Sequence, residues 1–225
     1  MTELHDRHFP GEDANYRQAR NELLEAELAL EEQLRKVADM RHALPAGGPV
    51  AEDYVFDTLE DGQDGTIRIS DLFTPGKSNL FLYSFMFGPN DEQPCPACTS
   101  IVDGFNGIAT HLDSFINLAI VAKAPIHRFA DFAESRGWDG VRLLSSAGNS
   151  YNSDYFAETP AGNQMPAANI FTRRDGQTRH FYSTELLYVD QPGRHPRHVD
   201  RLWPVWNLLD MTPEGRDVWD PKLSY

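Results

Sequence analysis

The feature that most constrains this chain is a nearly continuous apolar run, NLFLYSFMFG, at residues 79–88. A run of this length and composition is typical of a β-strand that is covered on both faces of a sheet. A polar loop follows, and from Cys95 to Leu112 apolar residues recur at helical spacing, although two glycines weaken that helix. The chain therefore contains a buried strand, a loop and a helix in immediate succession.

Further segments extend this pattern toward the C-terminus. We expect buried strands at 115–122 and 141–145, with a helix between them at 125–138. Short extended pieces at 50–73 carry turn residues and indicate a hairpin. A second hairpin is expected at 168–182. Strands and helices that alternate and then close on a hairpin predict an α/β fold with a mixed sheet flanked by helices.

The N-terminal part of the chain is different, because residues 12–43 have the pattern of one long helix. Pro45 and the glycines after it end that helix. We therefore divide the chain into an N-terminal helical arm, 1–48, and a domain with a C-terminal extension, 49–225. The apolar stripe of the arm has two explanations: it packs on its own domain, or it joins two copies in a homodimer.

Charge and hydropathy exclude several classes of partner. The chain has 34 acidic and 20 basic residues, a net charge of -14, so its surface repels nucleic acids and anionic lipids. No apolar run approaches the roughly 20 residues of a membrane-spanning helix. The N-terminus, MTELHDRHFP, has neither a signal peptide nor a basic transit peptide. We expect a cytoplasmic protein with no membrane partner.

Both cysteines of the chain lie in one motif, Cys95-Pro96-Ala97-Cys98. In a cytosolic protein this spacing indicates either a redox pair or half of a metal site. A thiolate at a helix N-terminus is stabilised by backbone N–H groups and the helix dipole, and Pro96 suits the first helical turn. Cys98, one turn later, lies where it could resolve a mixed disulfide formed by Cys95. Such chemistry needs no metal and no organic cofactor.

A zinc site is the first competing explanation of the motif. Structural zinc usually takes four ligands, and the chain has no second cysteine pair. His195 and His198, with Asp200 nearby, could supply ligands, but they lie far away in a loop rich in proline and glycine. We expect them to be solvated loop side chains.

Peroxide reduction is the second competing explanation, and a pair of inert thiols is the third. A peroxidatic cysteine of the peroxiredoxin type sits in a P-x-x-x-T-x-x-C pattern, and Gly88 and Glu92 break it at both positions before Cys95. Two inert buried thiols do not suit the polar, proline-containing loop that leads into the motif.

From residue 79 onward the chain resembles the thioredoxins, in which a cis-proline faces the C-x-x-C motif. Residues 165–171, MPAANIF, look like that segment. The resemblance implies a thioredoxin-like fold, a cis peptide bond before Pro166, and a Met165 backbone that pairs with an extended substrate beside Cys95. The alternative is a trans proline that begins an ordinary strand. Pro96, Met165 and Pro166 are therefore the candidate substrate-binding residues.

A closer resemblance covers about four-fifths of the chain. The layout is similar to a thioredoxin-like family known as a domain of unknown function, whose members are described as predicted dithiol-disulfide oxidoreductases. The segments that carry it are RHALP at 41–45, DYVF at 53–56, DLF at 71–73, FMFGP at 85–89, CPAC at 95–98, GW at 137–138 and LLDMTPEGRD at 208–217.

The chain departs from thioredoxin around the motif. The Trp-Cys-Gly-Pro-Cys core is absent, and proline stands at the first position between the cysteines, as in glutaredoxin-type motifs. Tyr83 and Ser84 occupy the region of the buried aspartate of thioredoxin. Asp91 and Glu92 would raise the pKa of Cys95 if they lay close to it in space.

Two hypotheses follow. In the first, the chain is a thiol-disulfide oxidoreductase that acts on a protein or small-molecule disulfide or thiol, with Cys95 as nucleophile and Cys98 as resolving residue. In the second, it is a non-catalytic thioredoxin-fold binding or scaffold protein. Aromatic residues at 151–156 and three tryptophans (Trp203, Trp206 and Trp219) then either line a partner surface or cover the edge of the sheet.

Overall fold

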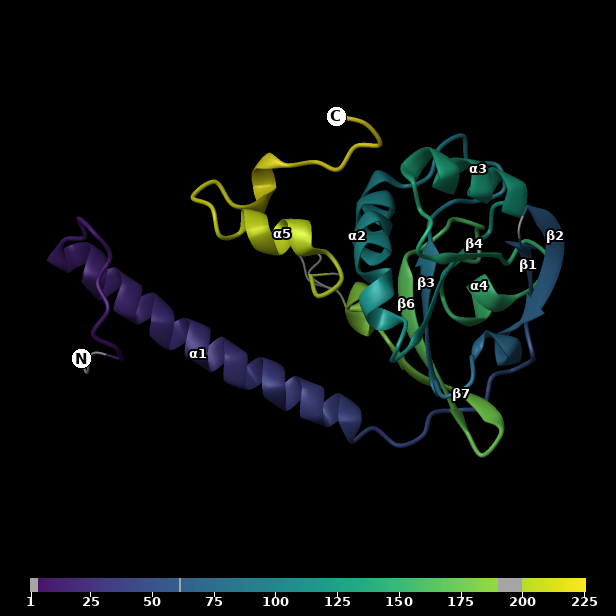
Figure 1. Ribbon diagram of the computed structural model, residues 1–225, viewed down its shortest axis with the longest axis horizontal. Helices are drawn as coiled ribbons and strands as arrows, with labels where there is room; N and C mark the ends of the chain where they lie inside the picture. The colour runs from purple at the N-terminus through teal and green to yellow at the C-terminus, as the bar shows by residue number, and fades with distance from the viewer. Residues whose placement is uncertain (1–3, 61, 190–199) are drawn as a thin grey trace. The chain divides into compact units, whose positions relative to one another are not determined.

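The computed structural model describes residues 4–60, 62–189 and 200–225, and it divides into two compact units. The first unit ends at Pro45 and consists mainly of helix α1, Ala14–His42. The Asp13 side chain caps this helix by accepting a hydrogen bond from the Tyr16 N–H at 2.8 Å. The second unit begins at Ala46 and contains the sheet (Figure 1).

The sheet has seven strands among the described residues, in the order β2-β1-β5-β4-β3-β6-β7. Their bounds are β1 Val55–Glu60, β2 Gln63–Arg68, β3 Asn79–Phe85, β4 Asn117–Ala122, β5 Arg142–Ser145, β6 Ala167–Arg174 and β7 Gln177–Ser183. Strands β3, β4 and β5 are parallel, and the two hairpins add antiparallel strands on either side.

The helices of the second unit connect and cover these strands. They are α2 Pro96–Leu112, α3 Ile126–Arg136, α4 Tyr151–Asp154 and α5 Pro204–Leu209, with 3-10 turns η1 Ile69–Leu72, η2 Glu185–Tyr188 and η4 Arg216–Val218. The β3-α2-β4 unit, joined by the β6-β7 hairpin on the other side of β3, gives the chain a thioredoxin-like fold. The expected α/β class and the N-terminal helix are confirmed.

The stretch 148–165 is more regular than its composition suggests. The stretch 148–165 is rich in small polar residues, yet it contains α4 and an antiparallel bridge between Glu158 and Gln164. The reason is tertiary, because Tyr151 and Asn152 of α4 are fully buried beside the sheet.

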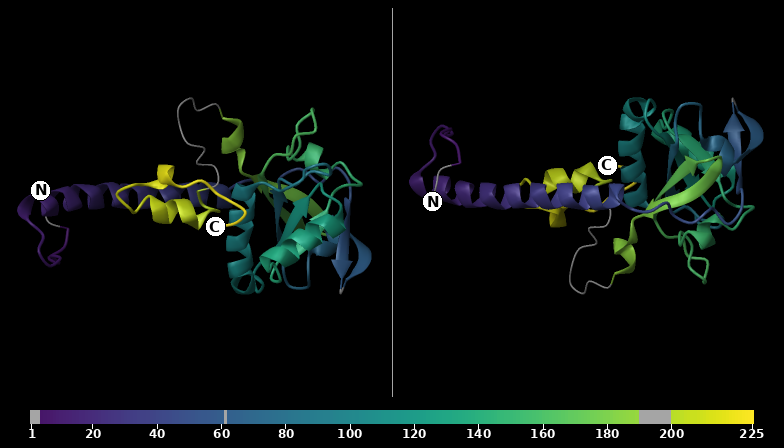
Figure 2. Two further views of the ribbon diagram at one scale, coloured as in Figure 1. Left: turned by 90° about the horizontal axis from the view of Figure 1, so that it is seen from above. Right: turned by 90° about the horizontal axis from the view of Figure 1, so that it is seen from below.

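Two hydrophobic cores lie on opposite faces of the sheet. Side chains of alternating β3 residues point to opposite faces, so Tyr83 and Phe85 enter one core while Leu80 and Leu82 enter the other. We call the first the thiol-side core, because it lies under α2 and α3 and contains Cys98 (Figures 1 and 2). The opposite core lies under α4 and η1, with Tyr151 at its centre.

The connection that follows the first unit lies along β7, the outer strand of the sheet. The Val50 N–H donates to the carbonyl oxygen of Thr178 at 3.1 Å, and the His180 N–H donates to that of Gly48 at 3.0 Å. At Gly47 the approach is so close that a Cβ would overlap the carbonyl oxygen of His180. Only glycine fits there.

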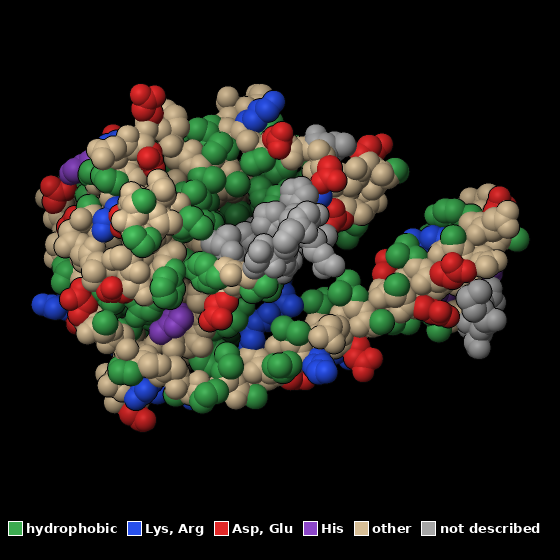
Figure 3. All heavy atoms as spheres, turned by 180° about the vertical axis from the view of Figure 1, so that it is seen from behind, with side chains coloured by type: hydrophobic (Ala, Val, Ile, Leu, Met, Phe, Trp, Pro, Cys, Tyr) green, Lys and Arg blue, Asp and Glu red, His purple; other side chains and the backbone are tan. Residues whose placement is uncertain are grey.

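The surface agrees with the acidic composition. Acidic side chains are scattered over the face shown in Figure 3, with apolar and neutral side chains between them. Within the described part of the chain, no helix combines the length and the apolarity that crossing a bilayer would require.

Candidate active site

Cys95 stands at the junction between β3 and α2, as the residue that caps the helix N-terminus. Its N–H donates to the carbonyl oxygen of Met86 at 3.0 Å. Its own carbonyl oxygen accepts hydrogen bonds from the N–H and the hydroxyl of Thr99, both at 3.0 Å. Both the N–H and the carbonyl group of Cys95 are therefore hydrogen-bonded, which fixes the backbone from which its side chain projects.

The two thiols lie together at this helix start, where the structure describes both as free cysteines. The Cys98 N–H donates to the Sγ of Cys95 at 3.5 Å. Pro96 takes the first helical position, where a residue without an N–H leaves no hydrogen bond unmade. Cys95 is partly exposed, whereas Cys98 is 2% exposed, so Cys95 is the thiol that a molecule in solution can reach.

The surroundings separate the acidities of the two thiols. A hydrogen bond from the Cys98 thiol, helped by the backbone N–H groups of Cys98 and Ala97, lowers the pKa of Cys95 to about 6 against the opposing effect of partial burial. The same contact with Cys95, together with burial, raises the pKa of Cys98 well above its usual range. At neutral pH the exposed sulfur is therefore a thiolate and the buried sulfur a thiol.

Asp91, one of the two acidic residues before the motif, is engaged within its own loop. The carboxylate of Asp91 accepts a hydrogen bond from the Gly88 N–H at 2.6 Å. Arg128 fixes this loop by donating to the carbonyl oxygens of Pro89 and Asp91. The low pKa of Cys95 is set by Cys98 and the helix start, without a contribution from this carboxylate.

The segment 165–166 differs from the arrangement that the thioredoxin resemblance implies. The described residues contain no cis peptide bond, so the prediction of a cis bond before Pro166 is wrong. The trans form is the favoured one, and here Pro166 simply precedes strand β6. The Met165 N–H donates to the carbonyl oxygen of Ala157 at 2.8 Å, so this amide is already used within the protein.

Tyr83 lies beside the two thiols, and the sequence pattern did not identify it as a site residue. It is 1% exposed in the centre of β3, and its ring packs edge-on against Phe105 of α2 with centroids 5.4 Å apart. Its hydroxyl lies beside the Cys98 thiol, where burial and this contact raise the pKa of Tyr83. The available signal was its position, because Tyr83 and Ser84 occupy the region of the buried aspartate of thioredoxin.

The zinc explanation gains no support from the described residues, which contain no cluster of three or more His, Cys, Asp or Glu side chains suited to a metal ion. Asp200 pairs instead with Arg216, whose Nη1 lies 2.8 Å from its Oδ1. His195 and His198 lie outside the described residues.

The aromatic residues singled out in the sequence mostly fill the cores. Tyr151 is fully buried, and Trp203 and Trp206 are 2% and 8% exposed against the thiol-side core. The indole N–H of Trp203 donates to the Ser100 hydroxyl of α2 at 2.9 Å. Phe156, at 67% exposed, is the exception. These tryptophans cover α2 more than they offer a surface to a partner.

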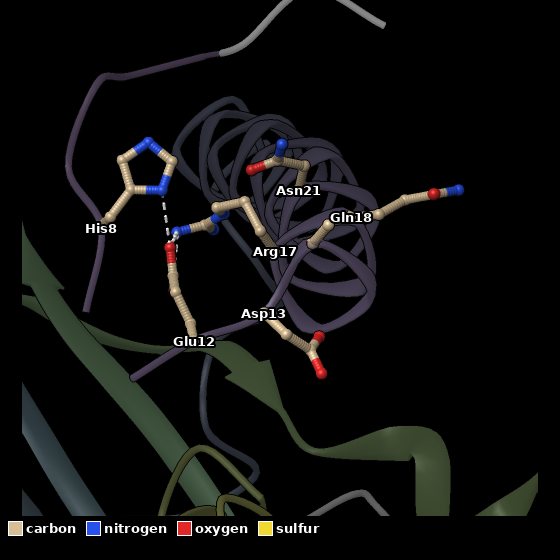
Figure 4. Close-up of a pocket in the computed structure, with 7 residues that line it drawn as sticks. His8, Glu12, Asp13, Arg17, Gln18 and Asn21 are labelled. Carbon is tan, nitrogen blue, oxygen red and sulfur yellow. Dashed lines mark hydrogen bonds and ion pairs between the residues drawn. The ribbon is translucent and has the colours of Figure 1, made fainter. Parts of the chain in front are cut away.

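A second polar cluster closes the start of α1 in the first unit (Figure 4). Its Glu12 carboxylate lies 2.7 Å from the His8 ring nitrogen and 3.4 Å from the Arg17 guanidinium. Arg17 also donates to the carbonyl oxygen of Arg7. This cluster holds the residues before the helix against its first turns, and its lining includes no cysteine, serine or threonine.

Among solved structures, the chain is similar to several peroxiredoxins at low sequence identity. The peroxiredoxin-like protein from Aquifex aeolicus shares 17% identity, with 62% of this chain and 75% of that chain covered and a TM-score of 0.44. Peroxidoxin BcpB from Mycobacterium tuberculosis shares 17% identity, with 74% and 98% covered and a TM-score of 0.45. The reduced 2-Cys peroxiredoxin from Plasmodium vivax shares 15% identity, with 74% and 97% covered and a TM-score of 0.48. Similarity at this level does not define an activity.

Comparison with family models identifies the family of this chain, and that family has no known function. A family model described as "Bacterial protein of unknown function (DUF899)" matches residues 6–223. No curated protein matches the chain.

Proposed function

Because this chain belongs to DUF899, a family of bacterial proteins of unknown function, we propose its activity from its own site: it is a thiol-disulfide oxidoreductase. Cys95 is the nucleophile and Cys98 the resolving residue. The observation that carries the proposal is the separation of the two thiols, one partly exposed with a lowered pKa and one buried with a raised pKa.

The reaction proceeds in two exchanges. The Cys95 thiolate attacks one sulfur of a substrate disulfide, forms a mixed disulfide, and releases the other substrate sulfur, which takes a proton from water. Cys98 then attacks the Cys95 sulfur and releases the second substrate thiol, which takes up the proton that Cys98 loses. The protein gives up two electrons and ends with a Cys95–Cys98 disulfide. A second thiol or dithiol partner reverses these steps and restores the reduced protein.

The helix start favours both exchanges for the same reason. The Cys98 N–H, directed at the Cys95 sulfur, stabilises its negative charge before attack and again when the sulfur leaves. The substrate is a disulfide or thiol of a protein or a small molecule that reaches Cys95 past Pro96 and Pro166, which we propose as flanking residues. Because the Met165 N–H already donates to Ala157 and Pro166 has no N–H, we propose that an extended substrate donates its own backbone hydrogen bonds to the carbonyl groups of this segment.

The test is the redox midpoint of the cysteine pair. The protein is equilibrated in graded glutathione or dithiothreitol buffers, its free thiols are alkylated, and the fraction of disulfide is measured by mass. We expect a reversible two-electron couple within about -120 to -270 mV, the range of thioredoxin-fold enzymes. The Cys95→Ser variant is the control. Thiols that never pair within one chain would overturn the proposal.

A non-catalytic binding protein remains the alternative, and the same experiment separates it from an enzyme. A homodimer through α1 is a further proposal. Several of its apolar side chains are exposed, among them Leu30 at 59% and Met40 at 62%. Light scattering of the full chain beside a Leu30→Glu variant tests it, since a loss of the dimer is expected only if this stripe forms the contact.

A further inference from the structure

The hydroxyl of Tyr83 is a buried polar group for which the ordinary packing of the sheet gives no reason. Tyr83 pairs with Ile120 of β4 and Ala168 of β6, so it lies in the middle of the sheet. Its ring contacts Phe105 two helical turns after Cys98. Phenylalanine would fill the same space, because every other part of the side chain makes apolar contacts in the thiol-side core.

This hydroxyl makes no hydrogen bond of regular geometry to any residue that the structure describes. A buried hydroxyl without a partner lowers stability, so such a group in a native core calls for an explanation. The group beside it is the Cys98 thiol, and each of the two shifts the pKa of the other. A thiol is a weak acceptor, whereas a thiolate is a strong one.

The other surroundings of Cys98 offer little that could stabilise a negative charge. Within the described part of the chain, the titratable groups that face it are Cys95 on its own helix and Tyr83 on β3, and the backbone of Met86 is the remaining polar contact. In the reduced protein Cys95 opposes ionisation of Cys98, because a hydrogen bond and a like charge both favour the protonated form. In the mixed disulfide the Cys95 sulfur is neutral, and Tyr83 is the titratable group among the described residues that still faces Cys98.

We propose that the Tyr83 hydroxyl donates a hydrogen bond to the Cys98 thiolate while Cys98 resolves the mixed disulfide. This inference rests on the proposed oxidoreductase function. In the step, Cys98 loses its proton to the departing substrate thiolate, and its sulfur bonds to Cys95 as the bond from Cys95 to the substrate sulfur breaks. Tyr83 keeps its own proton throughout, since burial makes the phenol less acidic than usual. Its O–H dipole stabilises the Cys98 thiolate at a point where the described residues bring no carboxylate, lysine or histidine to bear on Cys98.

The test follows the two exchanges separately with 5,5'-dithiobis(2-nitrobenzoate), whose released thiolate absorbs visible light. The first release reports attack by Cys95 and depends on reagent concentration. The second release reports resolution by Cys98 and does not. Stopped-flow traces are recorded for the wild type, Tyr83→Phe and Tyr151→Phe across the pH range. Tyr151 is the matched control, a fully buried tyrosine of the opposite core whose hydroxyl accepts from Asn169.

We expect Tyr83→Phe to slow the second release about tenfold near neutral pH and to displace its pH profile upward by about one unit. The first release should keep its rate, and Tyr151→Phe should keep both. A Tyr83→Phe protein whose second release has the wild-type rate and pH profile would overturn the inference. A wild type that never gives a second release would instead overturn the proposed function.

A second variant keeps the hydroxyl and guards against a folding defect. Replacing Tyr83 alone with 3-fluorotyrosine makes the phenol a stronger hydrogen-bond donor at nearly unchanged volume. The pH profile of the second release should then move downward, opposite to the effect of phenylalanine. A shift in the same direction for both variants would show that only packing had changed, and would also overturn the inference.

Discussion

The two faces of the sheet differ in what lies beside their buried polar groups. In the opposite core, Asn152 accepts a hydrogen bond from the Ser146 hydroxyl at 2.7 Å and donates to the side-chain oxygen of Gln164 at 2.9 Å. In the thiol-side core, the buried hydroxyl of Tyr83 has no regular partner among the described residues and lies beside a thiol. Each face also holds one buried hydroxyl without a regular partner, because Ser84 alternates with Tyr83 and points to the opposite core, but only the Tyr83 hydroxyl lies beside a thiol.

This difference separates buried polar groups that stabilise the fold from a buried group that could interact with a reacting thiol. A satisfied buried network specifies one arrangement, since every donor and acceptor would lose a partner in any other. An unsatisfied donor lowers stability slightly but can respond to a charge that appears during a reaction. Substitutions on the opposite core should therefore change stability, and those on the thiol side should change reactivity.

The largest effect is expected from Cys98→Ala. Without a resolving thiol the mixed disulfide on Cys95 persists, so a dithiobis-nitrobenzoate assay should give one release per chain in place of two. The pKa of Cys95 should also rise above about 6, because the Cys98 thiol is the main cause of its lowering. The pH dependence of alkylation measures this. A Cys95 pKa that does not move would show that the helix start alone sets it.

The next largest effect belongs to the opposite core. Asn152→Ala removes the shared partner of Ser146 and Gln164 and leaves the buried side-chain oxygen of Gln164 without its hydrogen-bond donor, which should lower the free energy of unfolding by about 2–3 kcal/mol. Urea unfolding of reduced protein measures the loss. The alkylation rate of Cys95 in this variant should match the wild type. A change in that rate would mean that the two faces are coupled.

A smaller, pH-dependent effect is expected at His180 in the same core. Burial lowers its pKa in the folded chain, and its ring nitrogen lies 3.0 Å from the Asn169 side-chain oxygen. The unfolded chain then binds a proton more readily, so the stability contributed by neutral His180 is present above about pH 6.5 and is lost as pH falls below it. His180→Gln should flatten this part of the pH–stability curve. A curve of unchanged slope would exclude His180 as its cause.

The smallest effect is expected from Asp91→Asn. The carboxylate is directed at the Gly88 N–H, so its removal should leave the Cys95 alkylation profile where it was. A profile displaced to lower pH would show that this charge reaches the thiolate after all. Glu92→Gln serves as the companion variant, since Glu92 is exposed in the same loop.

Much of the fold followed from local patterns. The apolar run at 79–88 predicted β3 because a covered strand needs no alternation, and the helical spacing after Cys95 predicted α2. The same lack of alternation hid the role of Tyr83. In a run that is apolar on both faces, the sequence does not say which residues face the helix that carries the thiols.

The remaining differences have tertiary causes. Helix α4 is short, and what holds it is the burial of Tyr151 against residues distant in sequence. The isomer of the bond before Pro166 is decided by a preference of under about 1 kcal/mol together with the surrounding contacts, so one resemblance could not fix it. A zinc site would have required His195, His198 or Asp200 to lie beside the cysteines, and the sequence does not show which distant residues are neighbours in space.

The segment at 47–50 has a consequence for behaviour in a crowded solution. An outer strand such as β7 presents a row of amide and carbonyl groups that another chain could extend into a larger sheet. Here the protein's own connection occupies part of that row, through Gly48 and Val50, and Gly47 permits an approach that a side chain would block. The segment that links the two units therefore also reduces the length of β7 on which another chain could add a strand. It can lie this close to β7 because Gly47 has no side chain.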